Sequence, residues 1–180
     1  MVKKYFKSLI LVVLIILFSV MILKRVFPIK YTETIDKYCK EYGIDKTLVL
    51  GIIKAESGFD ENATSQVGAM GLMQLKEETA LWCAEKMGIT LTTDDIKNPE
   101  LNIRIGIWYL NYLIEQTESE EIAIISYNAG VNKVNEWLED GIINMENINF
   151  EEIPYEETRN YIKKVLLYKQ IYSILYNINP

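Results

Sequence analysis

The sequence predicts an all-α fold, or a mainly α one, in which one domain follows a single N-terminal transmembrane helix. The first observation is an unbroken apolar run close to the N-terminus, over residues 8–23. The second is that apolar residues recur with a helical period from Tyr31 onward, while no stretch alternates with the period of two typical of strands. A length of 180 residues leaves room for one domain of ordinary size. We therefore expect a basic tip and a transmembrane anchor over residues 1–30 and a globular domain over residues 31–180.

The apolar run has the main features of a membrane span. Its 16 residues are fewer than the roughly 20 that a bilayer usually needs. Val26 and Phe27 lengthen it, however, and flanking basic side chains can reach the membrane surface. These basic residues are Lys3, Lys4 and Lys7 before the run and Lys24 and Arg25 after it. The alternatives are a cleaved signal peptide, although no small-x-small cleavage site follows the run, and a buried helix, which fits the basic flanks poorly.

Start and stop signals divide the remaining chain into helices. Gly43 ends the first, and Asp45 provides the cap of the second. Asn98 caps a longer helix that has Pro99 at its first position. Three glycines and several turn-forming residues mark residues 58–71 as a loop with room for a small hairpin. The expected helices cover residues 33–42, the apolar segment after Asp45, and residues 76–87, 99–116, 120–128, 131–138 and 156–176.

The charge is distributed unevenly along the chain. All six basic residues before position 31 precede the first carboxylate, Glu33. Subtracting them from the 19 Lys+Arg leaves 13 against 25 Asp+Glu, so residues 31–180 carry a net charge of −12. Such a domain would repel the phosphates of nucleic acid, which we exclude as a partner. The chain has no histidine, which excludes Ser-His-Asp and Cys-His catalytic triads and most zinc sites.

The two cysteines, Cys39 and Cys83, are too few and too far apart in sequence for a metal cluster. They are either two buried thiols or, if the domain lies outside the cell, one disulfide. Of these two interpretations we favour buried free thiols.

Four short motifs place polar side chains where helices give way to loops. The first is Glu56-Ser57-Gly58-Phe59, at the end of the apolar helix that follows Asp45. A carboxyl group half-buried in a cleft has a raised pKa and can stay protonated near neutral pH, as an acid catalyst must. Taken alone, this motif fits equally well the commoner case of a solvated glutamate at a helix end.

The second motif is the segment Gly-Ala-Met-Gly-Leu-Met-Gln-Leu at residues 68–75. Its glycines permit a close approach of the backbone to a ligand. Met73 offers an adaptable apolar surface, and Gln74 an amide that can donate to and accept from sugar hydroxyl or acetamido groups. The alternative is a loop folded back on the core, with Leu72, Met73 and Leu75 buried.

The third and fourth motifs can each be explained by ordinary helix structure as well as by a functional site. In Ser126-Tyr127-Asn128-Ala129-Gly130, a phenol and an amide stand at a helix break, where Gly130 could simply be the C-cap. In Glu157-Thr158-Arg159-Asn160-Tyr161, the first and last residues share one face of the final helix. This segment could also be the capped start of an amphipathic helix.

The order and spacing of the four motifs together resemble the catalytic domain of the soluble lytic transglycosylase family, whose relatives include goose-type lysozyme. That family has a long block around a Glu-Ser pair, followed by Ala-Tyr-Asn-Ala-Gly and then by Glu-Thr-x-x-Tyr. The resemblance covers about residues 32–175. The matching residues are Glu56-Ser57, Phe59, Ala63, Ser65, Gly68-Ala69, residues 71–75, residues 127–130, Glu157-Thr158 and Tyr161. Two departures, Lys76-Glu77-Glu78 before Thr79-Ala80 and Ser126 in place of alanine, leave fine substrate preference open.

The resemblance implies a lysozyme-like domain that cleaves peptidoglycan between N-acetylmuramic acid (MurNAc) and N-acetylglucosamine (GlcNAc), without water and with a 1,6-anhydroMurNAc product. Glu56 would be the single catalytic acid and base. The substrate-binding residues implied are Ser65, Met73, Gln74, Tyr127, Asn128 and Tyr161, with Tyr127 also near Glu56. Ser57 and Glu157 would support the site. No metal and no other cofactor is implied.

This function also implies a location. Peptidoglycan lies outside the cytoplasmic membrane, so the domain should face the cell wall on a single-pass anchor, or be secreted if the N-terminal segment is cleaved. The net negative charge of the domain disfavours binding to anionic wall polymers. We therefore leave open a partner protein of the wall machinery that delivers the domain to its substrate. Two other functions stay open: a hydrolytic muramidase, for which Asp60, Glu61, Asp94 and Asp95 are candidate second carboxylates, and a non-catalytic wall-binding module.

Overall fold

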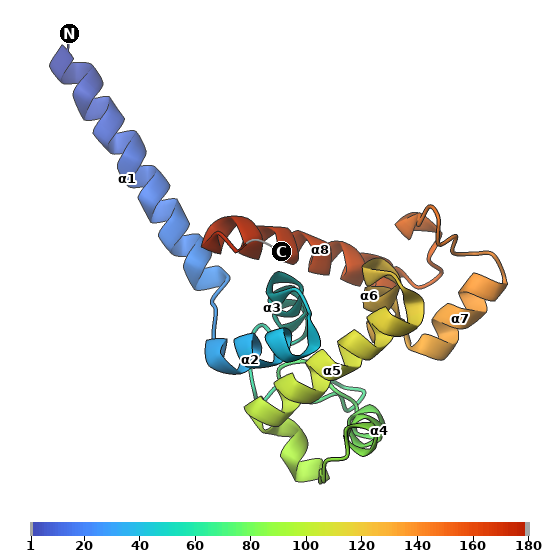
Figure 1. The fold of residues 1–180 in the computed structure, drawn as a ribbon. Helices are drawn as coiled ribbons and strands as arrows, with labels where there is room; N and C mark the ends of the chain where they lie inside the picture. The colour runs from blue at the N-terminus through green and yellow to red at the C-terminus, as the bar shows by residue number, and fades with distance from the viewer. Residues whose placement is uncertain (1, 179–180) are drawn as a thin grey trace.

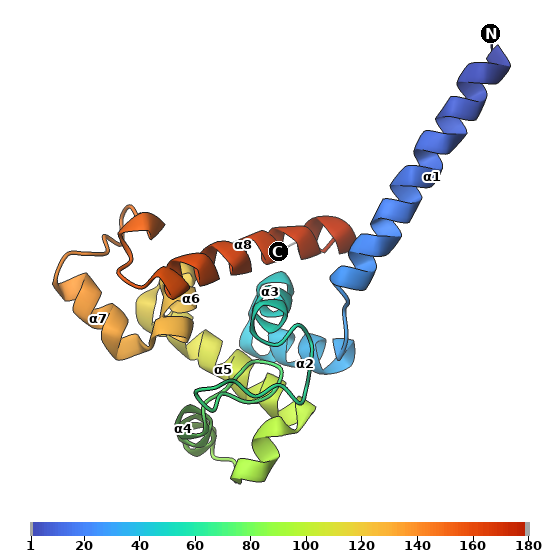
Figure 2. The same ribbon diagram turned by 180° about the vertical axis from the view of Figure 1, so that it is seen from behind.

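The structure, a computed structural model, describes residues 2–178. Within that range every regular element is an α-helix or a short 3-10 helix (η), and no strand occurs. Helix α1 (Val2–Val26) projects away from the remaining helices, which pack together (Figures 1 and 2). The others are α2 (Thr32–Tyr42), α3 (Lys46–Glu56), α4 (Glu77–Met87), η1 (Thr93–Lys97), α5 (Pro99–Thr117), α6 (Glu120–Ala129), α7 (Val131–Glu139), η2 (Phe150–Glu152) and α8 (Glu156–Tyr176). The predicted all-α fold is confirmed.

The capping signals set the helix ends where the sequence predicts them. Asp45 accepts a hydrogen bond from the backbone N–H of Thr47 at 2.8 Å, and Asn98 accepts one from Leu101 at 3.1 Å. Gly43 and Gly88 end α2 and α4 in the left-handed conformation that favours glycine. The two 3-10 helices were not predicted. The small hairpin does not form either, since the loop between α3 and α4 makes only isolated bridges.

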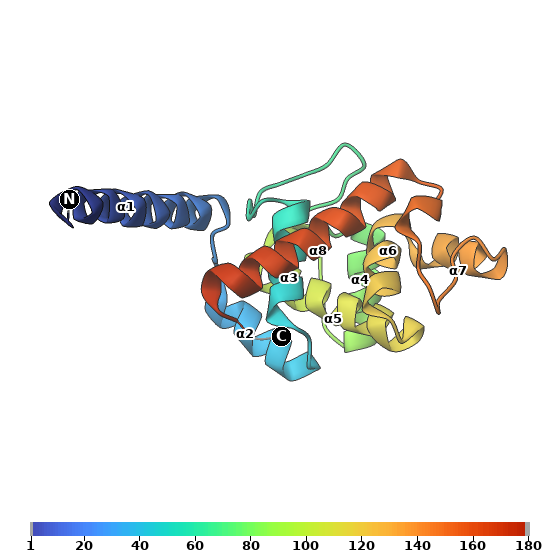
Figure 3. The ribbon, with the colours of Figure 1, turned by 90° about the horizontal axis from the view of Figure 1, so that it is seen from above.

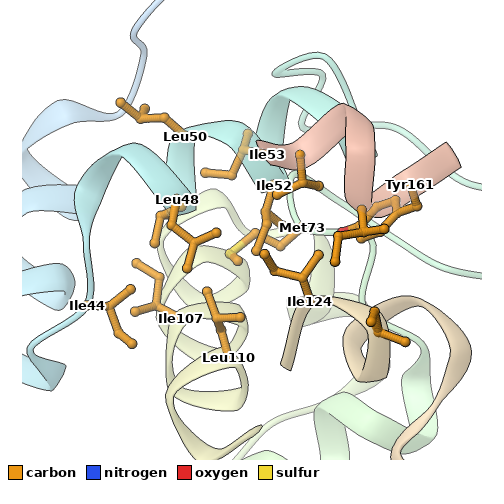
Figure 4. Packing of buried hydrophobic residues seen from close by; sticks show 14 of the residues in the cluster. Ile44, Leu48, Leu50, Ile52, Ile53, Met73, Ile107, Leu110, Ile124 and Tyr161 are labelled. Atoms are coloured by element: carbon orange, nitrogen blue, oxygen red, sulfur yellow. The ribbon is translucent and has the colours of Figure 1, made fainter. Parts of the chain in front are cut away.

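Helix α3 runs through the centre of the main core. Nearly all of its residues from Thr47 to Ile53 are fully buried, and it packs along α8 on one side and faces α5 and α6 on another (Figures 3 and 4). Gly51 permits the close approach of α8, because a Cβ atom there would lie 3.0 Å from the carbonyl oxygen of Val165. This contact brings the C-terminal end of α3 beside the first half of α8.

A smaller core lies beneath α4. Its buried residues are Leu75, Ala80, Cys83, Ile96 and Ile105. Both cysteines are buried free thiols, Cys39 in the main core and Cys83 in the smaller one, which confirms the interpretation favoured from the sequence. Burial raises the pKa of each thiol to about 12, so neither is a thiolate near neutral pH.

Helix α1 contains one window, Leu9–Val26, that is long and apolar enough to cross a membrane, and none of it is buried against the rest of the chain. The packed domain begins earlier than the predicted boundary at residue 31. Phe27 is buried in the main core, and its carbonyl oxygen accepts a hydrogen bond from the Tyr176 hydroxyl at 2.7 Å. The carbonyl oxygen of Pro28 accepts one from Tyr172 at 3.1 Å. The boundary therefore lies near residue 27.

This boundary leads to a prediction about stability. A fragment of residues 31–180 lacks Phe27 and Pro28, so two tyrosine hydroxyls lose their acceptors and an aromatic pocket empties. We expect it to be less stable than a fragment of residues 27–180 by about 3 kcal/mol, the cost of truncating a buried phenylalanine. Urea denaturation of both fragments compares their free energies of unfolding. Equal values would show that the domain does begin at residue 31.

Candidate active site

Glu56 is the last residue of α3 and lies half-buried beside α8. The hydroxyl of Tyr161, on α8, donates a hydrogen bond of 2.7 Å to Oε1 of Glu56. The ammonium group of Lys164, one turn further along α8, donates to the carbonyl oxygen of Ala55 at 3.0 Å. The close packing of α3 and α8 at Gly51 thus positions one carboxyl group against a phenol and near a cation.

The environment of Glu56 raises its pKa to about 7 from its ordinary value of 4.5. Burial is the main cause, because it disfavours the charged form. The hydrogen bond from Tyr161 and the charge of Lys164 lower the pKa, and the charge of Glu157 raises it. Burial also raises the pKa of the Tyr161 phenol well above 10, so this hydroxyl stays a donor. A carboxyl group with a pKa near 7 can give up and take back a proton at neutral pH.

Glu56 lies where two cavities meet. The first has a volume of about 410 Å³ and the second about 350 Å³, and Glu56, Asn128 and Glu157 line both. The other residues lining the first are Ser65, Val67, Ala69, Gln74, Leu75, Lys76, Thr79, Tyr109, Tyr127, Ala129 and Gly130. The second is completed by Ala55, Asn160, Tyr161 and Lys164. The lining mixes amides, hydroxyls and aromatic faces, which suits a neutral polar ligand such as a sugar chain.

The loop between α3 and α4 forms one wall of the first cavity and is held at both ends. The hydroxyl of Ser57 donates to the carbonyl oxygen of Leu72 at 2.8 Å and accepts from the N–H of Phe59 at 3.1 Å. The side-chain amide of Gln74 donates to the carbonyl oxygens of Gly71, at 2.9 Å, and Ala63, at 3.2 Å. Ser57 and Gln74 therefore fix the shape of the loop that faces Glu56.

The opposite wall comes from the break between α6 and α7. The hydroxyl of Tyr127 donates to the carbonyl oxygen of Met73 at 2.9 Å, so this wall is tied to the loop across the cavity. Oδ1 of Asn128 accepts a hydrogen bond of 2.7 Å from Thr158, which joins it to α8. On the loop side of the same cavity, the hydroxyl of Ser65 accepts a hydrogen bond from the N–H of Ala69 at 3.0 Å.

One of the expected placements differs in the structure. Met73 has no exposed surface: its side chain packs against Gly106 of α5, where a Cβ atom would lie 2.4 Å from the methionine sulfur. Its side chain is part of the core and lines neither cavity, so its link to the site is the backbone carbonyl that Tyr127 binds. Tyr127 and Glu56 line the same cavity, and the hydrogen bond to Glu56 comes from Tyr161, because α8 crosses α3 at that point.

The hydrogen bond from Tyr161 leads to a prediction about acidity. Tyr161→Phe removes a donor that favours the carboxylate, so the pKa of Glu56 should rise above 7 and the group become an about tenfold weaker acid. Titration of the Glu56 carboxyl carbon by NMR measures this change. Tyr127→Phe is the matched control, because its hydroxyl binds Met73 and not Glu56. A Glu56 titration unchanged by Tyr161→Phe would contradict the proposed interaction.

The sequence did not predict three residues that line or support the site. Asn102, on α5, is fully buried, and its side chain bonds the backbone of Met73 at 2.7 Å. A lone polar residue between Leu101 and Ile103 in an apolar helix was the signal, since a buried amide must find partners. Tyr109, which lines the first cavity, and Lys164, which lines the second, had no distinguishing signal among the many tyrosines and lysines.

Comparison with known proteins identifies the family. The family described as "Transglycosylase SLT domain" matches residues 33–142, which are more than half of the chain. A second description, "Soluble lytic transglycosylase helical domain", matches residues 152–180.

The chain is similar in sequence to several known lytic transglycosylases. The soluble lytic murein transglycosylase of Salmonella typhimurium is 34% identical over 83% of this chain and 24% of its own length. The membrane-bound lytic murein transglycosylase C of Glaesserella parasuis is 31% identical over 79% of this chain and 46% of its own length. The chain thus spans about a quarter to a half of these relatives.

Among solved structures, an inactive mutant of the Pseudomonas aeruginosa lytic transglycosylase Slt superposes with a TM-score of 0.79 at 34% identity, over 88% of this chain and 26% of that one. The 70 kDa soluble lytic transglycosylase of Escherichia coli gives 0.78 at 32% identity, over 86% and 26%. The family match covers most of the packed domain and the fold agrees, so the chain belongs to the transglycosylase SLT domain family, as its motifs predict.

Proposed function

We propose that this chain is a peptidoglycan lytic transglycosylase that cleaves the β-1,4 bond between MurNAc and GlcNAc and leaves a 1,6-anhydroMurNAc end. The observation that carries the proposal is the half-buried carboxyl group of Glu56, whose pKa of about 7 suits one group to act first as acid and then as base. Membership of the family and the names of its relatives, which are lytic murein transglycosylases, support the same reaction.

The reaction needs only one carboxyl group. Protonated Glu56 donates its proton to the glycosidic oxygen, and the bond from that oxygen to C1 of MurNAc breaks. The resulting carboxylate then takes the proton of the C6 hydroxyl of the same MurNAc, whose oxygen bonds to C1. Glu56 is protonated again, and GlcNAc leaves with a free 4-hydroxyl. An intramolecular nucleophile is already positioned, which takes the place of the second carboxylate that ordinary glycosidases use.

The residues around Glu56 would either bind the glycan or hold the site in shape. Ser65, Gln74 and Asn128 line the cavity with hydroxyl and amide groups that suit the hydroxyls and acetamido groups of the glycan. Tyr161 would position Glu56, while Tyr127 and Ser57 would hold the two walls. Glu157 lines both cavities but is exposed, so it is suited to brace the site or to meet substrate at its rim.

Three of the four candidate second carboxylates are engaged elsewhere. Asp60 accepts from the N–H of Asn62, Glu61 accepts from the Tyr31 hydroxyl, and Asp95 accepts from Thr92. Neither these three nor Asp94 lines either of the two cavities. This arrangement favours the transglycosylase over a hydrolytic muramidase.

The location follows from the proposed substrate. We place α1 across the cytoplasmic membrane and the packed domain on the cell-wall side, which agrees with a membrane-bound relative among the matches. Glycan strands of peptidoglycan and the membrane itself are then the partners of the chain.

The test is mass spectrometry of purified peptidoglycan after incubation with the detergent-solubilised full chain. Muropeptides ending in 1,6-anhydroMurNAc are the expected product. Reducing MurNAc ends in their place would identify a hydrolase and direct attention to Glu157 as its second carboxylate. If no fragment is released, while the protein still sediments with peptidoglycan, the chain is a wall-binding module and the proposed reaction is wrong.

A further inference from the structure

The last turn of α8 lies beside the last turn of α1. The ammonium group of Lys24, on α1, is 5.1 Å from the ring centroid of Tyr176, on α8. The hydroxyl of the same tyrosine donates to the carbonyl oxygen of Phe27, just after α1. Figures 1 and 2 show the C-terminal end of α8 next to the base of α1. The end of the packed domain is thus level with the end of the apolar window at Val26.

The segment between α1 and α2 is fixed and is no flexible tether. We call residues 27–31 the collar. Phe27 packs edge-on against Tyr168 and Tyr172, with ring centroids 5.2 and 5.7 Å apart. The hydrogen bonds from Tyr172 and Tyr176 tie the collar to α8.

Two further bonds tie the collar to the loop that follows Glu56. The ammonium group of Lys30 donates to the carbonyl oxygen of Phe59 at 3.3 Å, and the Tyr31 hydroxyl donates to Glu61 at 2.5 Å. Phe59 in turn packs against Tyr172, with the ring centroids 6.4 Å apart. Since contacts from both directions hold the collar, the direction in which α1 leaves the domain is set.

The α8 end carries side chains that suit a membrane interface. Ile174 is 74% exposed, an unusual state for so apolar a residue. Tyr176 and Lys24 belong to the two residue types that anchor proteins at the headgroup level, where an amphipathic ring and a long basic side chain meet both lipid and water. Leu167, two turns before Ile174 on α8, is also exposed.

We propose that the C-terminal turn of α8 is a membrane contact: Ile174 and Tyr176 rest in the headgroup region of the bilayer that α1 crosses. The partner is a lipid surface, and the contact holds the packed domain in one orientation against it. This proposal rests on the proposed anchor and not on the chemistry at Glu56.

The test is the depth of a nitroxide label in the full chain, reconstituted in vesicles of phosphatidylethanolamine and phosphatidylglycerol. Cysteines are introduced one at a time at Leu14 in α1, at Ile174, and at the exposed Met145. Met145 belongs to the segment between α7 and η2, and this segment lies on the side of the domain away from α1 (Figures 1 and 3). Native Cys39 and Cys83 are buried and compete poorly for the label. Power saturation compares access to oxygen, which concentrates in lipid, with access to a water-soluble nickel chelate.

We expect oxygen access to dominate for the labels at Leu14 and Ile174 and nickel access to dominate for the label at Met145. A label at Ile174 that behaves like the one at Met145, with Leu14 still in lipid, would overturn the contact and leave the anchor intact. A label at Leu14 that meets mainly nickel would overturn the anchor and the contact with it. Cleavage of peptidoglycan by the same preparations reports separately on the proposed reaction.

A second variant tests the collar itself. Tyr176→Phe keeps the ring and removes the bond to Phe27, so the label at Ile174 should lose part of its oxygen access while the label at Leu14 keeps its own. Tyr155→Phe is the matched control, because this tyrosine is exposed at the other end of α8. Identical depth profiles for the two variants would show that the Tyr176 bond does not hold the domain against the membrane.

Discussion

Replacing Glu56 with glutamine is expected to lower the rate of glycan cleavage by about a thousandfold or more, because in the proposed reaction this one group serves as acid and then as base. The amide keeps the size of the side chain, so the cavities should keep their shape and still bind glycan. Release of soluble muropeptides from purified peptidoglycan gives the rate. Glu157→Gln is the matched control: this carboxylate lines the same cavities but is exposed, and measurable turnover should remain. A Glu56→Gln variant with near-native turnover would contradict the assignment.

The same substitution should change how stability depends on pH. The folded protein holds the Glu56 proton more tightly than the unfolded chain, because burial raises the pKa from 4.5 to about 7. This contribution is fully present below the unfolded pKa and is lost as the pH rises toward 7 and above, where the ionised carboxylate costs about 3 kcal/mol. Glu56→Gln cannot ionise, so it should be the more stable protein in alkaline buffer. Urea denaturation of both proteins at acidic and alkaline pH tests the difference.

Replacing Asn102 with alanine should have the largest effect on stability. Its side chain accepts from the N–H of Met73 at 2.7 Å and donates to the carbonyl oxygens of Met70, at 3.0 Å, and Ile96, at 2.9 Å. Alanine removes the partner of the Met73 N–H and of the Ile96 carbonyl oxygen, whereas the carbonyl oxygen of Met70 still accepts from the N–H of Leu75 at 3.0 Å. A buried unpaired group costs about 1–3 kcal/mol. We expect the free energy of unfolding to fall by about 3 kcal/mol or more.

Activity should fall as well, because Asn102 holds the loop that faces Glu56. A displacement of about 1 Å can lower turnover about a hundredfold. Asn111→Ala provides a matched control on the same helix, since that side chain bonds only to Glu115 one turn away. Its free energy of unfolding should stay within about 0.5 kcal/mol of wild type. Similar losses in the two variants would show that the ties from Asn102 to the loop are unimportant.

The sequence predicted the elements whose signals are local. Asp45, Asn98 and the glycines at positions 43 and 88 act through their immediate neighbours, so the helix ends near them agree with the structure. The motif around Glu56 identified the family for a similar reason, because its spacing is preserved along one continuous stretch of chain.

The features that the sequence did not predict depend on contacts between distant segments. Tyr161 meets Glu56 across 105 positions because α8 crosses α3, and no local pattern encodes that crossing. For Met73 the sequence left two placements open, facing a ligand or buried in the core, and the space that Gly106 leaves on α5, a distant segment, decides for the core. The boundary near Phe27 was missed because an apolar residue after an apolar run looks like part of the run until α8 is seen to cover it.

Helix α8 joins the proposed membrane contact to the carboxyl group of Glu56, the proposed catalytic residue. Tyr176 marks its membrane end, and Tyr161, which holds Glu56, lies 15 residues earlier on the same helix. At 1.5 Å per residue, these 15 residues of α8 span about 22 Å, which sets the scale of the distance between Glu56 and the headgroups in the proposed arrangement. In the proposed arrangement, α8 sets the distance between Glu56 and the membrane, so only glycan strands in this thin layer next to the membrane would reach Glu56, and the outer layers of a thick wall would not.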